Sequence, residues 1–189
     1  MTAPVAPRAG DPGPAREDLV IRRATEADAE RLAELARRTF VETFGPDNTA
    51  EDMAIHVARS FGADIQLGEI RDARMTTLLA ELGSVTVGFA QVHQSPPPAC
   101  VTGEAPIEVR RFYVDRPYHG RGIAQVLMRA VEQTARSLRG RTLWLGVWER
   151  NPRAIAFYSK CGFVDVGHHA FVVGTEEQTD RVMARAVGL

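Results

Sequence analysis

The chain has 189 residues, of which 44% are hydrophobic and 25% charged, the balance of a soluble globular protein. This length favours one α/β domain that buries roughly 70% of its unfolded surface, so folding needs no disulfide or metal. The formal net charge of −1 and the lack of a Lys/Arg run give no support for nucleic-acid binding. No apolar run is long enough to span a membrane.

The N-terminal segment and the two cysteines indicate how the chain is organised and where it is located. Met1–Glu17 holds Pro, Gly and Ala but little apolar material, so we expect a flexible tail ahead of a single domain over residues 18–189. It has no apolar core of the kind that a signal peptide needs. Cys100 and Cys161 show no CxxC spacing, which argues against a zinc site and fits a reducing, cytoplasmic location.

In chain order, the hydrophobic pattern begins with a strand and two helices. A short apolar-to-polar run indicates the strand, and apolar residues at helical spacing after a Thr N-cap indicate each helix. The predicted elements are the strand Leu19–Arg23, a helix of about five turns from Thr25 to the break at Gly45–Asn48, and a second helix that opens at Thr49.

From Met75 onward the pattern alternates as strands do, and Gly83-Ser84 predicts a tight hairpin. Residues 94–106 are rich in proline and predict an irregular loop. The remaining predicted elements are the strands Thr76–Leu82, Val85–His93 and Ile107–Val114, a helix after Gly122, the strand Thr142–Trp148, a short helix from Asn151 to Lys160, and the strands Phe163–Val173 and Arg181–Val187.

The turn after Val114 carries the first chemical signal. Gly120 and Gly122 have no Cβ atoms, so consecutive amides can converge on an anion at the helix N-terminus, where the helix dipole favours negative charge. The pattern indicates a pyrophosphate cradle, with an ordinary tight turn as the simpler alternative. No Gly-Lys-Ser/Thr follows and a third glycine is absent, so a nucleotide-binding protein is the weaker interpretation.

A second segment, Asn151–Phe163, reads Asn-Pro-Arg-Ala-Ile-Ala-Phe-Tyr-Ser-Lys-Cys-Gly-Phe. Together with the turn His119–Ala124, it resembles the GCN5-related N-acetyltransferases, whose main motifs are an Arg/Gln-x-x-Gly-x-Gly/Ala turn and an Asn…Ala…Phe-Tyr…Gly-Phe helix. The likeness extends over nearly all of Leu19–Val187 in element order. It implies an α/β fold with a mixed, mostly antiparallel sheet of about seven strands and about four flanking helices. It also implies acetyl transfer from acetyl-CoA to an amine.

Three further segments make the likeness closest to the bacterial spermine/spermidine acetyltransferase-like branch: Thr39–Gly45, Leu143–Glu149 and Glu177–Asp180. This branch implies a polyamine as the first candidate substrate. The sequence departs from the family at His119, where Arg or Gln is usual. The backbone N–H of His119 can still serve, but the side-chain contribution to phosphate binding is left open.

The resemblance also implies a set of cofactor contacts. Backbone groups of Tyr113 and Val114 would meet the pantetheine arm of acetyl-CoA, and the amides of Arg121–Ala124 would bind its pyrophosphate. A solvated arginine and a surface turn are the simpler explanations of Arg121 and His119, and helix capping alone explains Asn151. The expected set is Tyr113, Val114, His119, Gly120, Arg121, Gly122, Ile123, Ala124 and Asn151.

Two residues are candidates for proton transfer. Amide formation expels a thiolate, and Tyr158 in the Phe-Tyr motif would protonate it; a core tyrosine is the alternative. The amine is protonated at neutral pH, so a base is needed, and Glu108 is the candidate unless it only pairs with Arg110 or Arg111. Because the amine can attack the thioester directly, Cys161 is expected to be a packing residue.

The acceptor amine would lie near the junction of the first two helices. Glu42 and Phe44 are the expected substrate contacts, with Asp47 and Asp52 close by, because carboxylates and an aromatic ring suit a cation. Solvated helix charges and a core phenylalanine are the simpler explanation of these residues. Trp148, on an alternating strand, is expected in the core and not in contact with a ligand.

Several alternatives stay open. The acceptor could be a protein N-terminus, a lysine or an antibiotic amine, because variable loops build acceptor pockets. In another class, the chain could be a non-catalytic acyl-CoA-binding regulatory module, against which Tyr158 and Glu108 argue. No metal, membrane or nucleic-acid partner is expected. The predicted loop Gly174–Arg181 and the last strand offer a surface for a homodimer.

Overall fold

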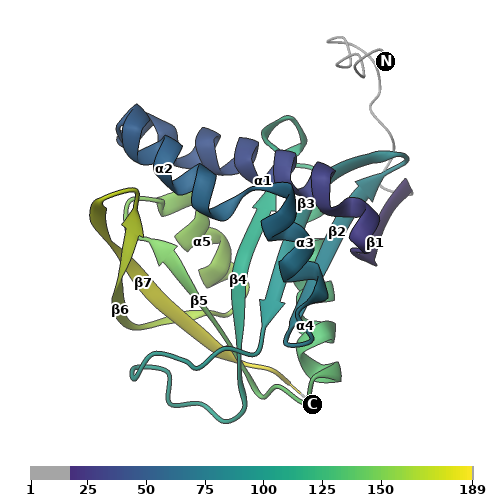
Figure 1. Ribbon diagram of the computed structural model, residues 1–189. Coiled ribbons are helices and arrows are strands. Elements are labelled where there is room, and N and C mark those ends of the chain that lie inside the picture. Colours follow the sequence, from purple (N-terminus) through teal and green to yellow (C-terminus); the bar gives the residue numbers. More distant parts are fainter. Residues whose placement is uncertain (1–17, 189) are drawn as a thin grey trace.

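The computed structural model describes residues 18–188, so the predicted tail Met1–Glu17 lies outside the described residues. Figure 1 shows one sheet with helices on both faces. The elements are β1 (Leu19–Arg23), α1 (Ala29–Phe44), α2 (Ala50–Ser60), α3 (Ala63–Arg71), β2 (Met75–Leu82), β3 (Val85–His93), β4 (Pro106–Val114), α4 (Ile123–Ser137), β5 (Thr142–Trp148), α5 (Pro152–Lys160), β6 (Val164–Val173) and β7 (Glu176–Ala186).

The strands form a seven-stranded sheet in the order β1-β2-β3-β4-β5-β7-β6. Neighbouring strands run antiparallel except β4 and β5, which run parallel. The α/β fold with a mixed, mostly antiparallel sheet is thereby confirmed. The parallel pairing extends only from Pro106↔Thr142 to Glu108↔Trp144, and beyond that point β4 and β5 separate. This separation positions the site.

Two hydrophobic cores hold the helices against the sheet (Figure 1). On one face, α4 places Ile123, Leu127 and Val131 at helical spacing, and all three are buried. On the other face, α1 buries Leu32 and Phe40 in a cluster shared with α2. Each fully buried side chain of this size stabilises the fold by about 1.5–3 kcal/mol. The helices on both faces of the sheet are therefore firmly packed around the β4–β5 gap.

Two parts of the fold differ from the sequence prediction. The described residues contain five α-helices, not about four, because α3 was not foreseen: its fully buried residue is the polar Gln66, whose amide donates to the Ser60 carbonyl. The predicted loop Gly174–Arg181 is mostly strand, since β7 begins at Glu176 and pairs with β6 as far as Val173. The loop proposed for a dimer contact is therefore largely hairpin.

A β-bulge in β4 changes which face its side chains reach. Gln91 pairs with Arg111 and Val92 with Val109, so Arg110 is the additional residue. Before the bulge Val109 faces α4, and after it Tyr113 faces α1. Simple alternation would have placed Val109 and Tyr113 on one face.

In residues 18–188, no helix is both long and apolar enough to cross a bilayer.

Candidate active site

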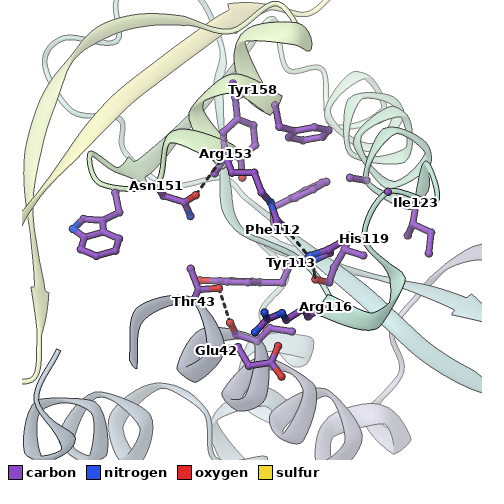
Figure 2. Close-up of a pocket in the computed structure, with 18 of the residues that line it drawn as sticks. Glu42, Thr43, Phe112, Tyr113, Arg116, His119, Ile123, Asn151, Arg153 and Tyr158 are labelled. Atoms are coloured by element: carbon purple, nitrogen blue, oxygen red, sulfur yellow. Dashed lines mark hydrogen bonds between the residues drawn. The ribbon is translucent and has the colours of Figure 1, made fainter. Parts of the chain in front are cut away.

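A cavity of about 850 Å³ opens where β4 and β5 separate, bounded by the end of α1, the start of α4, and α5. Figure 2 shows Tyr158, Asn151 and Tyr113 around a common space, with Glu42 and Thr43 on α1 at its opposite side. The predicted site residues that line the cavity are Glu42, Tyr113, Val114, His119, Gly120, Ile123, Ala124, Asn151 and Tyr158. The sequence motifs therefore converge on one site.

The glycine turn has the backbone shape that an anion cradle requires. Gly120 and Gly122 have φ of 76° and 79°, in the left-handed region where other residues lose about 1–2 kcal/mol. Gly122 immediately precedes α4, whose first turn receives no side-chain cap. Helix amides of this kind need an acceptor, and a phosphate supplies one. A Cβ on Gly120 would meet nothing within 4 Å, so the space beside it is open.

His119 ties the turn to the sheet. Its Nε2 lies 2.6 Å from the carbonyl oxygen of Val114 and 3.1 Å from Nη2 of Arg153 on α5 (Figure 2). The side chain thus binds the strand end that precedes the turn. The cavity offers other cations in place of the usual Arg at this position, because Arg116, Arg150, Arg153 and Lys160 also line it.

Asn151 acts as a helix cap and still faces the cavity. Its Oδ1 accepts from the Ala154 amide at 3.0 Å, which leaves the Nδ2 group for other acceptors. Arg121 and Gly122 are not among the lining residues. The Arg121 guanidinium lies over the Tyr118 ring, 5.4 Å from its centroid, at the edge of the turn.

Tyr158 is a buried phenol that lines the cavity. Its ring contacts Phe163 and Phe112 edge-on, at centroid distances of 5.8 and 6.2 Å. Burial, and then the neighbouring Tyr113, raise the pKa of Tyr158 above its ordinary value. The phenol therefore keeps its proton at neutral pH and can donate it.

The acceptor side of the cavity is formed by the end of α1. Glu42 and Asp47 line it, and both are exposed. Phe44 does not line the cavity: it packs behind it, 4.5 Å from the Phe40 ring and 5.2 Å from the Trp148 ring. Trp148 does line it, whereas the strand pattern had placed it only in the core.

Glu108 lies apart from the cavity. Its carboxylate accepts from the Ser95 hydroxyl at 2.6 Å and lies 3.4 Å from Nδ1 of His93. Tyr113 lies five positions further along the strand, about 16 Å away at the usual rise per residue. The alternative ion pair with Arg111 is not formed, because Arg111 pairs with Glu69 at 2.6 Å.

Within the described chain, no group of three or more His, Cys, Asp or Glu side chains could hold a metal.

The comparison with protein families agrees with the geometry. The profile of the acetyltransferase (GNAT) family matches residues 29–163, which include both the glycine turn and α5. An uncharacterised N-acetyltransferase of Mycobacterium bovis is 32% identical over 158 residues, which are 84% of this chain and 97% of that protein.

Solved structures share the fold. The PaiA N-acetyltransferase of Thermoplasma acidophilum, solved in complex with coenzyme A, superposes with a TM-score of 0.73 at 20% identity, covering 89% of this chain and 98% of that one. The spermidine/spermine N-acetyltransferase SpeG of Vibrio cholerae has a TM-score of 0.64 at 16% identity, covering 90% and 95%. Identities this low show a common architecture.

Proposed function

We propose that this chain, which belongs to the acetyltransferase (GNAT) family and uses acetyl-CoA, acetylates a primary amine of a small molecule. Polyamines are the first candidates. The observation that carries this proposal is the position of Tyr158. Its proton-bearing hydroxyl lines the same cavity as the glycine turn at the start of α4. A group that can protonate a leaving thiolate and a cradle for phosphates are thus combined in one site.

The residues around the cavity fit acetyl-CoA. The left-handed glycines and the uncapped first turn of α4 suit its pyrophosphate, and the backbone of Tyr113 and Val114 at the end of β4 suits its pantetheine arm. Asn151 adds an amide donor from the opposite wall. Bound there, acetyl-CoA supplies an acetyl thioester to the amine.

Tyr158 would act late in the reaction. The phenol donates its proton to the departing sulfur, and its buried, T-shaped contacts hold the ring in place for this transfer. Because the amine itself attacks the thioester carbonyl, no nucleophile of the chain is needed. Cys161 fits this picture, since burial raises the pKa of its thiol and so disfavours the thiolate.

A cationic acceptor fits the carboxylates at the end of α1. Glu42 and Asp47 line the cavity and would attract an ammonium group, and Trp148 offers a ring face nearby. A polyamine carries several ammonium groups and could use more than one of these contacts. This assignment of the acceptor also draws on the resemblance of Thr39–Gly45 to the polyamine branch.

The test is acetyl-CoA-dependent thiol release with a panel of amines: spermidine, spermine, short diamines, an aminoglycoside, and peptides that offer an N-terminus or a lysine. Saturable release with polyamines alone would support the whole proposal. Release with a different amine would keep the reaction and discard the polyamine. If calorimetry showed tight acetyl-CoA binding but no amine released thiol, the regulatory-module alternative would replace the enzyme.

A further inference from the structure

Gly146 on β5 leaves room for two ionisable side chains from the neighbouring strands. A Cβ at this position would lie 2.7 Å from Nε2 of His169 and 3.0 Å from Oδ2 of Asp180. His169 comes from β6, two strands away, so its ring reaches across β7 to cover the Gly146 backbone. Gly146 lies two residues beyond Trp144, the last β5 residue paired with β4, and therefore borders the gap between those strands.

Asp180 is a buried carboxyl with few polar contacts to offset the cost of its burial. The residue is 8% exposed, and neither its Oδ1 nor Nε2 of His169 has a hydrogen-bond partner within the described residues. The nearest approach of the pair, Nε2 to Oδ2, is 3.9 Å, too long for a hydrogen bond. A buried polar atom without a partner costs about 1–3 kcal/mol, a cost that folding alone does not explain.

Neither Asp180 nor His169 lines the cavity, but Asp180 is paired with a residue that does. Asp180 pairs across the ladder with Trp148, which lines the cavity, and both project from the face of the sheet that Tyr113 also occupies. Burial raises the pKa of Tyr113 to about 12, and the Asp180 charge contributes to that rise. The carboxylate is therefore close enough to Tyr113 to act on it electrostatically.

Other charged groups on this face are engaged elsewhere. Arg111 of β4 pairs with Glu69 at 2.6 Å, and His56 of α2 stacks on Phe40 at a centroid distance of 4.4 Å. His169 and Tyr113 are thus the ionisable groups that face Asp180 from β6 and β4. His169 makes no hydrogen bond to the carboxylate.

We propose that Asp180 is the proton acceptor for the substrate amine, with His169 as its positioning residue across Gly146. This inference rests on the proposed function. It replaces Glu108 in that role, because Glu108 is held by Ser95 where β4 and β5 are still paired, whereas Asp180 is the ladder partner of Trp148, which lines the cavity. Asp180 would first attract the ammonium group and then take one of its protons.

The protons balance. An ammonium group enters with three: one passes to an Asp180 oxygen and then to solvent, which leaves the lone pair on nitrogen for attack on the thioester carbon. As the C–N bond forms and the C–S bond breaks, a second proton leaves nitrogen, and in net terms the sulfur gains one through Tyr158. The amide keeps the third. Burial raises the pKa of Asp180 to about 6, so the group is mostly ionised at pH 7 yet basic enough to accept a proton.

The first test compares Asp180→Asn with the wild-type protein in thiol release and in acetyl-CoA calorimetry. We expect the kcat/KM for the amine to fall about 10²–10³-fold, with acetyl-CoA affinity within about twofold of wild type. The wild-type pH profile should decline below pH ~6, and the variant should lose that limb. Asp165→Asn is the matched control: this β6 carboxylate is 47% exposed, pairs with Arg181, and should leave the rate unchanged.

A second variant moves the pair and keeps both charges. The added Cβ of Gly146→Ala would lie too close to the His169 and Asp180 side chains and should displace both. We expect an intermediate loss of kcat/KM with the same acetyl-CoA affinity. His169→Gln, which keeps a hydrogen-bonding side chain, should shift the acidic limb and lower the rate less than Asp180→Asn. An equal loss in all three variants would contradict a specific proton acceptor.

A measurement without turnover checks the carboxyl itself. The folded pKa of Asp180, about 6, lies above the unfolded value of about 3.9, so its ionisation destabilises the fold above pH 6. Asp180→Asn should therefore raise Tm by roughly 5 °C at pH 8, with no gain at pH ~4. An active wild type with an equally active Asp180→Asn variant would overturn this inference alone. An inactive wild type would overturn it together with the proposed function.

Discussion

The imidazole of His119 and the carbonyl of Val114 are joined by a 2.6 Å contact that closes the loop between β4 and α4. Arg153 approaches the same Nε2 at 3.1 Å. A carbonyl only accepts and a guanidinium only donates, so Nε2 can serve one of these partners at a time. The tautomer with hydrogen on Nε2 holds the loop, and the other tautomer would hold α5.

This contact predicts that His119 preorganises the phosphate turn. His119→Ala should weaken acetyl-CoA binding about fivefold, as expected for the loss of one hydrogen bond of about 1 kcal/mol. His119→Gln should retain the affinity, because its amide can donate to the Val114 carbonyl. Calorimetry measures both. Equal weakening in the two variants would mean that the ring, and not the hydrogen bond, is required.

Removal of the Tyr158 hydroxyl should separate catalysis from binding. Tyr158→Phe keeps the aromatic contacts with Phe112 and Phe163, so the fold and acetyl-CoA affinity should be unchanged. We expect kcat to fall about 10²-fold because the departing sulfur loses its proton donor. Tyr118→Phe, at another tyrosine of the same cavity, is the control and should keep its rate. Undiminished turnover in Tyr158→Phe would remove the phenol from the mechanism.

The left-handed turn should not accept a side chain. Gly122 has φ of 79°, a region that β-branched residues avoid, so Gly122→Val should weaken acetyl-CoA binding by at least tenfold in calorimetry. Gly68→Ala is a useful comparison, since a Cβ there meets nothing within 4 Å and the residue lies inside α3. That variant should be slightly more stable and bind normally. A folded Gly122→Val protein with full affinity would refute the cradle.

Acid should remove a specific stabilising cluster near the N-terminus of α1. The Asp28 side chain is 2% exposed and accepts hydrogen bonds from Arg22 and Arg31; that from Arg22 is the main cause of a pKa well below its usual range. A depressed pKa stabilises the fold above the unfolded value near 3.9, and this stability is lost as pH falls toward the folded pKa.

Asp28→Asn should therefore cost about 3–5 kcal/mol of unfolding free energy at pH 7, with a smaller difference at pH 3. Urea denaturation at the two pH values measures this. Asp64→Asn, at an exposed position in the first turn of α3, should change stability by less than about 0.5 kcal/mol. A loss that stays constant between pH 7 and 3 would rule out the carboxylate as its source.

Local patterns predicted the strands well where each has its own apolar alternation. Val85–His93 and Thr142–Trp148 coincide with β3 and β5 because tight turns or glycines bound them. The polar start of β7, Glu176–Asp180, was read as a loop because its strand identity comes from pairing with β6. Non-local pairing of this kind leaves little trace in composition.

The site was predictable where a motif is continuous in the chain. The turn His119–Ala124 and the helix with Tyr158 were located from their residues, and both reach the cavity. The bulge at Arg110 has no sequence signature here, so neither the face nor the neighbours of Glu108 could be deduced. Asp180 and His169 meet only through strand order, and Gly146 was the one local sign that something lies over β5.

The short parallel contact between β4 and β5 divides the sheet into two parts that are each continuous in sequence, β1–β4 and β5–β7. Few ladder hydrogen bonds join these parts, so we expect the amides of β5, β6 and β7 to exchange with deuterium as one cooperative unit, ahead of β2 and β3. A ligand lodged in the gap touches both parts and would slow that exchange together across the unit. Substrate bound in the cavity would therefore restrict motion between the two parts of the sheet.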